Sequence, residues 1–111
     1  MREEFMGQGT GANLRLRKQL REGIEQLKAG ELDAARATFS DIIASTPDSA
    51  MAHLGLGIVH FLENDVQAAL QCFQEALKRD PTSSMAKVFI ARAREELGDV
   101  DAAMDDYEEA N

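Results

Sequence analysis

Cysteine and proline are scarce in this chain of 111 residues, and each shortage excludes a class of structure. The single cysteine, Cys72, excludes an internal disulfide framework and predicts a reducing compartment, the cytoplasm. Two prolines and eight glycines are too few for a turn-dominated all-β fold. No run of about 18 apolar residues occurs, so we expect no membrane span. We also expect no secretory signal, since the opening residues hold no apolar stretch of that kind.

Negative charge dominates the composition, but it is unevenly placed. The net charge is -8. Residues 1–30 carry six lysines and arginines against four glutamates, whereas from Glu95 onward there are eight acids and no lysine or arginine. An acidic chain repels phosphate backbones, so nucleic acid is excluded as a partner class.

Three local features suggest chemistry, and each has a simpler structural explanation. His53 and His60 lie seven residues apart, on one helical face, but two neutral ligands without a nearby acid make a poor metal site. The glycines of residues 7–11 follow no strand, as a phosphate loop would require. Cys72 has no base within helical reach. We therefore predict no catalytic residue, no metal and no cofactor.

The strongest pattern is an internal repeat. Pro47 and Pro81 lie 34 residues apart, and other positions repeat with the same period. The matching columns hold a small residue, a helix-ending residue, an acid, an alanine and an aromatic. They are Gly23/Gly57/Ala91, Gly30/Asn64/Gly98, Glu31/Asp65/Asp99, Ala35/Ala69/Ala103 and Phe39/Phe73/Tyr107.

Each column has a physical role in a stack of helix pairs. Small residues and alanine let two antiparallel helices approach closely, and the aromatic four residues after the alanine fills the gap between pairs. Glycine or asparagine ends a helix in the left-handed conformation, and the acid that follows is placed to cap the next helix. Proline stops the second helix of each pair. The pattern predicts an all-α chain without strands.

The predicted helices are joined by connections of two to four residues, which place consecutive helices antiparallel. The first helices are expected over about Leu14–Ala29, Ser49–Glu63 and Ser84–Leu97. The second helices are expected over about Leu32–Ser45, Val66–Arg79 and from Val100 to the end.

The central unit reads His53-x-x-Leu56-Gly57-x-x-His60, Ala69-x-x-x-Phe73, Pro81. It resembles the tetratricopeptide repeat, whose usual pattern is W-x-x-L-G-x-x-Y, A-x-x-x-F, P. The resemblance implies a right-handed superhelical stack of about three units, the last one truncated. We place a flexible leader at residues 1–13, a repeat domain at 14–111, and units at about 16–49, 50–83 and 84–111. The usual tryptophan and tyrosine are replaced throughout, and Glu22 stands where leucine is expected.

In this family the first helices line a concave groove that binds peptides, so the resemblance implies an adaptor or scaffold that holds a helical or apolar segment of a protein partner. The expected groove residues are Arg17, Leu20, Ile24, Leu27, Met51, Leu54, Ile58, Phe61, Leu62, Met85, Val88 and Arg92. The carboxylate clamp of some family members needs lysine, asparagine and arginine in this groove. The corresponding places here hold Leu20, Ile24, Gly55, Met85 and Phe89, so we exclude that specialisation.

Two alternatives stay open. Small, acidic tetratricopeptide proteins serve as class II chaperones of type III secretion, and Leu54-Gly55-Leu56-Gly57 is similar to one of their repeats. The chain also ends at Asn111, before the polar helix that usually closes such a stack. We expect either that it is a fragment or that another molecule covers its last helix. A basic first helix and an acidic last one could join copies head to tail, which is the self-assembling alternative.

Overall fold

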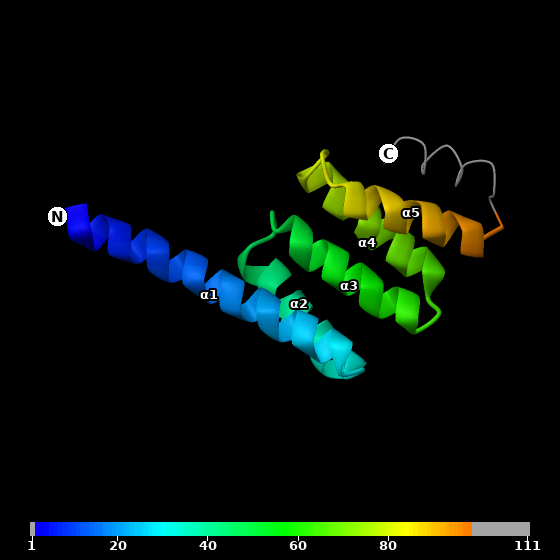
Figure 1. Ribbon diagram of the computed structural model, residues 1–111, viewed down its shortest axis with the longest axis horizontal. Coiled ribbons are helices and arrows are strands. Elements are labelled where there is room, and N and C mark those ends of the chain that lie inside the picture. The colour runs from blue at the N-terminus through cyan, green and yellow to red at the C-terminus, as the bar shows by residue number, and fades with distance from the viewer. Residues whose placement is uncertain (1, 99–111) are drawn as a thin grey trace.

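A computed structural model describes residues 2–98 of the chain, with side chains for residue 11 and residues 13–98, and all regular structure in this range is helical (Figure 1). The helices are α1 (Arg2–Lys28), α2 (Leu32–Ser45), α3 (Ala50–Leu62), α4 (Val66–Arg79) and α5 (Ser84–Glu96). Each packs against the next along the chain, and α1 also contacts α3. Helices α1, α3 and α5 form one layer and α2 and α4 the other, which confirms the predicted stack of antiparallel pairs.

The helix bounds agree with the prediction except at the start of the chain. Helices α2 and α4 have the predicted bounds, and α3 and α5 differ only at their terminal residues. Helix α1, however, begins at Arg2 rather than near Leu14, so the leader expected over residues 1–13 is helical from its second residue. The segment has no proline to stop a helix, although the glycines at residues 7, 9 and 11 have low helix propensity. The predicted last helix, from Val100, lies outside the described residues.

The predicted helix-ending residues adopt the left-handed conformation. Gly30, Asn64 and Gly98 have φ of 78°, 66° and 86°. The capping prediction holds for Asp65, whose carboxylate accepts a hydrogen bond from the Ala68 amide at 3.3 Å. It is wrong for Glu31, which makes no side-chain cap. Glutamate is one methylene longer than aspartate, which reaches the cap amides better, as the shorter asparagine and serine side chains also do.

Two phenylalanine rings lie at the centre of the packing. Phe39 and Phe73, from the second helices, are 1% and 0% exposed. A Cβ added at Gly23 would lie 2.7 Å from the Phe39 ring, and one added at Gly57 would lie 2.6 Å from the Phe73 ring. A Cβ added at Gly55 of α3 would lie even closer to the same ring atoms of Phe39. The glycines therefore let the ring of one helix pack directly on the backbone of the next.

We expect the Gly57→Ala substitution to destabilise the fold by about 1–2 kcal/mol. The added methyl collides with the buried Phe73 ring, and the gain in helix propensity offsets only part of this. Urea denaturation followed by circular dichroism measures the difference. Gly11→Ala is the matched control, because nothing lies within 4 Å of its Cβ, and it should be neutral or stabilising. A Gly57→Ala protein as stable as the parent would contradict the close approach.

A second matched pair tests the caps. Asp65→Ala should lower the free energy of unfolding by about 1 kcal/mol, because the Ala68 amide loses its acceptor. Glu31→Ala, at the equivalent position of the preceding repeat, should change it by less than about 0.5 kcal/mol, since no cap bond is lost. Equal losses from the two substitutions would argue against the capping difference seen here.

Candidate functional site

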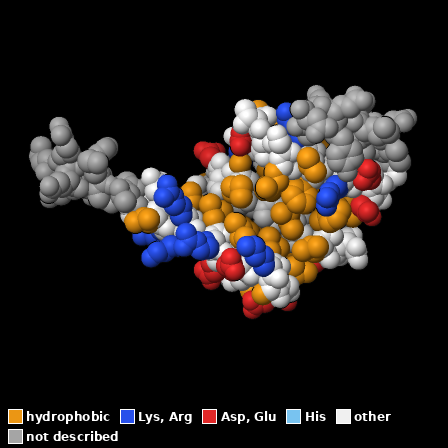
Figure 2. Space-filling view, viewed as in Figure 1, with side chains coloured by type: hydrophobic (Ala, Val, Ile, Leu, Met, Phe, Trp, Pro, Cys, Tyr) orange, Lys and Arg blue, Asp and Glu red, His pale blue; other side chains and the backbone are white. Residues whose placement is uncertain are grey.

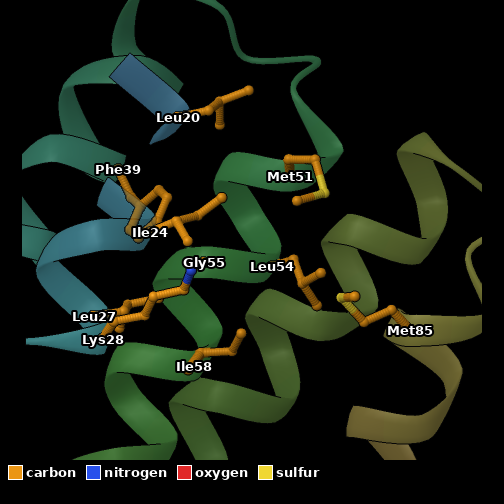
Figure 3. A pocket seen from close by; sticks show the side chains of 10 residues that line it. All are labelled: Leu20, Ile24, Leu27, Lys28, Phe39, Met51, Leu54, Gly55, Ile58 and Met85. Carbon is orange, nitrogen blue, oxygen red and sulfur yellow. The ribbon is translucent and has the colours of Figure 1, made fainter. Parts of the chain in front are cut away.

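An apolar groove lies on the face formed by the first helices, and Figure 3 shows its walls. It encloses about 250 Å³ and is lined by side chains of α1, α3 and α5, with one residue from α2. In Figure 3, Leu20 and Met51 lie at one end, Leu27, Lys28 and Ile58 lie toward the other, and Met85 lies at the side formed by α5. The walls are apolar throughout, so Lys28 contributes the aliphatic part of its side chain.

The helical period explains how this wall forms. Leu20, Ile24 and Leu27 follow one another at spacings of four and three, so they lie on one face of α1. Met51, Leu54 and Ile58 do the same on α3, and Met85 begins the corresponding row on α5. Because α1, α3 and α5 form one layer, the three rows meet along a single surface.

Seven of the twelve predicted groove residues line this pocket. They are Leu20, Ile24, Leu27, Met51, Leu54, Ile58 and Met85. The other five, Arg17, Phe61, Leu62, Val88 and Arg92, do not line it. Phe61 is half-buried against the core instead, with its ring centroid 6.5 Å from that of Phe73. Its position on α3, between the core and the groove face, accounts for this packing.

The residues that line the pocket differ in how far they are available to a ligand. Leu54 is 3% exposed and belongs to the core, and Ile58 is half-buried against the same cluster. Met51 and Met85 are 45% and 54% exposed. The accessible part of the site is therefore built largely from two methionines, whose unbranched side chains adapt their shape to a partner.

Sequence reasoning missed one contributor to the groove, Phe39, although it placed Gly55 in the groove. Phe39 was expected to fill the gap between helix pairs, which it does, but it also forms part of the groove floor. It reaches the floor because Gly55 has no side chain to cover it. The signal in the sequence was the second glycine of Leu54-Gly55-Leu56-Gly57, since the repeat column explains only Gly57.

Polar contacts near the groove serve the fold. The Pro47 carbonyl accepts a hydrogen bond from Arg79 Nε at 2.8 Å and lies 3.0 Å from His53 Nε2, which ties the loop before α3 to α4. Arg36 pairs with Glu63 and, at 3.1 Å, with Asp33. Among the described side chains, no polar or charged residue is fully buried and no three metal-ligating residues cluster together.

Cys72 lies beside the core on α4 and does not line the groove. Burial raises the pKa of its thiol above the ordinary value, and the charges of Glu75 and Asp65 raise it further. A higher pKa leaves less thiolate at neutral pH, and thiolate is the reactive form. The surroundings of Cys72 are those of a packing residue.

The family assignment follows from this fold together with a sequence comparison. The family model described as tetratricopeptide repeat matches residues 20–84 and again residues 63–110. The chain belongs to the tetratricopeptide repeat family. A comparison with curated proteins found no match. Within residues 2–98, no helix of this tetratricopeptide protein is both long enough and apolar enough to cross a membrane.

Solved structures with the same arrangement include other tetratricopeptide proteins. The second tetratricopeptide domain of Spaghetti (RPAP3), bound to the HSP90 peptide SRMEEVD, matches with a TM-score of 0.83 and 18% identity, over 93% of this chain and 95% of that one. A crystal structure of MamA matches with a TM-score of 0.78 and 22% identity, over 86% of this chain and 56% of that one. MamA from Desulfovibrio magneticus RS-1, residue 41 to the end, matches with a TM-score of 0.78 and 18% identity, over 83% of this chain and 52% of that one.

These identities establish the shared fold only. The chain spans about half the length of the MamA proteins that it matches.

The raised pKa of Cys72 predicts slow alkylation of the folded protein. At pH 7.5, iodoacetamide should modify Cys72 more slowly in buffer than in denaturing urea, because unfolding returns the thiol to its ordinary pKa. The ratio of the two rates should shrink as the pH rises through the folded pKa, where both states are thiolate. Equal rates at pH 7.5 would show that the thiol is accessible and unperturbed.

Proposed function

We propose that this tetratricopeptide domain is a protein-interaction module that holds an apolar or amphipathic segment of a protein partner in its groove. The observation that carries the proposal is the apolar pocket with Met51 and Met85 exposed at its wall. Large apolar side chains that stay exposed side by side on one face are typical of interaction surfaces. An amphipathic helix laid in such a groove buries its apolar face and keeps its polar face in water.

The kind of ligand is supported by what the pocket lacks. Tetratricopeptide domains generally mediate protein–protein interactions, and the RPAP3 domain was solved with a peptide of HSP90. In this chain, Leu20, Ile24, Gly55 and Met85 line the pocket where the carboxylate clamp would place its polar residues. A chain-terminal carboxylate placed among these side chains would lose water without gaining charge-assisted hydrogen bonds. The groove therefore favours apolar side chains of the partner.

The domain is non-catalytic under this proposal and works in a reducing compartment such as the cytoplasm, as its single cysteine favours. The family match over residues 63–110 supports a third repeat that begins with α5.

A secretion chaperone would bind its client in the same way, and the client would become insoluble when the chaperone is absent. Self-assembly is the competing function. Light scattering distinguishes it from partner binding, because a protein that stays monomeric at low and high salt leaves its groove free for a partner.

Aspartate at the exposed methionines tests the proposal. The probe is a synthetic peptide of about fifteen residues with leucine on one helical face and glutamine and alanine elsewhere, followed by fluorescence anisotropy. Met51→Asp combined with Met85→Asp should weaken binding more than about tenfold, because the carboxylates would be desolvated against the leucines. Helical content should stay unchanged, since both side chains are exposed.

Leu14→Asp is the control. Leu14 is an exposed apolar residue of similar accessibility, 48%, but it does not line the pocket. Its substitution should leave peptide binding within about twofold of the parent, in line with surface changes away from a binding site. A peptide that fails to bind the parent, or that loses affinity equally with both variants, would overturn the groove as the binding site.

A further inference from the structure

The groove face carries positive charge although the chain as a whole is acidic. Lys28 lines the pocket itself. Arg17 lies on α1 seven residues before Ile24, and Arg92 lies on α5 seven residues after Met85. Seven residues are close to two helical turns, so both arginines project from the groove faces of their helices, and both are exposed. Figure 2 shows basic side chains at the edges of the apolar patch on this face.

The three cations stand at both ends of the groove. Arg17 extends the α1 row beyond Leu20, toward the end that carries Leu20 and Met51. Lys28 is at the opposite end, beside Ile58. Helices α1, α3 and α5 run in the same direction in one layer, and Arg92 lies about two turns beyond Met85, toward the C-terminal end of α5. A segment lying along α3 would therefore meet a cation near each end of its apolar row.

These cations differ from the basic residues that the fold uses. Arg36 and Arg79 are held in ion pairs, with Glu63 and Glu75. Lys28 has only an exposed partner, Glu25 at 3.6 Å, which a ligand carboxylate could replace. No ion pair joins Arg17 or Arg92 to any other residue within the described part of the chain. Acids also lie on this face, since Glu25 pairs with Lys28 and Glu96 follows Arg92 by one turn, and Figure 2 shows acidic side chains at several edges of the apolar patch.

We propose that the occupant of the groove is an acidic amphipathic helix, with a row of apolar residues flanked by glutamate or aspartate side chains. The proposal rests on the groove function above and adds the charge of the partner. Its apolar row would pack on Met51 and Met85, and its carboxylates would lie toward Arg17, Lys28 and Arg92. Its length along α3, which has 13 residues, would be about 20 Å.

This mode of binding differs from a carboxylate clamp in the part of the partner that it contacts. The cations stand at the margins of the apolar pocket, so they can reach side-chain carboxylates on the flanks of a helix and have no need of a chain end. The side-chain carboxylates of an internal segment of a partner are therefore sufficient to pair with these cations. Capping both ends of the peptide should therefore leave its affinity unchanged.

A charge-exchange experiment tests the proposal. Two amidated and acetylated peptides share the leucine face of the neutral probe and carry either glutamate or lysine on the flanking positions. Binding to the full chain and to Arg17→Glu/Arg92→Glu is measured by anisotropy at about 150 mM salt, where charges about 8 Å apart are already screened. The parent should bind the glutamate peptide at least about tenfold more tightly than the lysine peptide. The double variant should lose or reverse this preference.

Arg15→Glu is the matched control. Arg15 is an exposed arginine on the same helix, two positions from Arg17, which puts it on the opposite face of α1. It makes the same change in net charge as Arg17→Glu alone without altering the groove face, so the preference for the glutamate peptide should persist in Arg15→Glu and weaken in Arg17→Glu. Equal loss from these two single variants would mean that overall charge sets the preference, and would overturn the proposal.

The remaining outcomes separate this inference from the proposed function. If the neutral, glutamate and lysine peptides bind equally and Met51→Asp/Met85→Asp weakens all three, the groove binds apolar segments and the acidic partner is wrong. If no peptide binds, both proposals are wrong. If the free protein is a dimer that Met51→Asp/Met85→Asp turns into a monomer and that excludes the peptides, the occupant is a second copy, and the acidic partner is again wrong.

Discussion

The close approach of helix backbones to two phenylalanine rings is the constraint on which the rest of the structure depends. Phe39 and Phe73 occupy equivalent places in successive repeats, and each packs on a glycine of a first helix. Phe39 also packs on Gly55, so one ring from α2 contacts the backbones of both α1 and α3. A ring packed against bare backbone leaves little freedom in the spacing of two helices, because protein interiors are dense and side chains there have few alternative rotamers.

The groove is a direct consequence of this packing. With Phe39 behind Gly55, the layer of first helices has an apolar floor, and α1 and α3 supply the walls. The same residues serve two purposes, since Leu54 closes the core on one side and lines the pocket on the other. A bound segment would therefore continue the hydrophobic core outward. For that reason Met51 and Met85, which are exposed, are the positions where binding and stability can be separated.

Charge adds a second level of organisation to the same surface. The chain carries a net charge of -8, yet lysine and arginine stand at the margins of the groove. Net charge acts over the whole molecule and is screened within about 10 Å at ordinary salt, whereas side chains beside a ligand act at contact distance. A domain that is acidic overall can therefore still present a locally basic binding face, which is the physical basis for the partner proposed above.

The sequence by itself determined the repeat, the helix order and most helix ends. A 34-residue period with small, aromatic and helix-ending residues in fixed columns admits few other architectures, and Gly30 and Asn64 take the left-handed conformation that their columns predict. Local chemistry was less reliable where side-chain length matters, as at Glu31, which does not cap, or where glycines suggested a leader, as before Leu14, which lies inside α1.

Only the tertiary structure decided which of the predicted groove residues are buried in the core and which stay accessible to a ligand. Helical period placed Phe61 and Ile58 near one face, but packing against Phe73 and the neighbouring core removed much of each from solvent. Period alone cannot report how deeply a side chain is covered, because that depends on residues from other helices. The contribution of Phe39 to the groove floor had the same origin. It required knowing that a ring from α2 fills the space that a glycine in α3 leaves open.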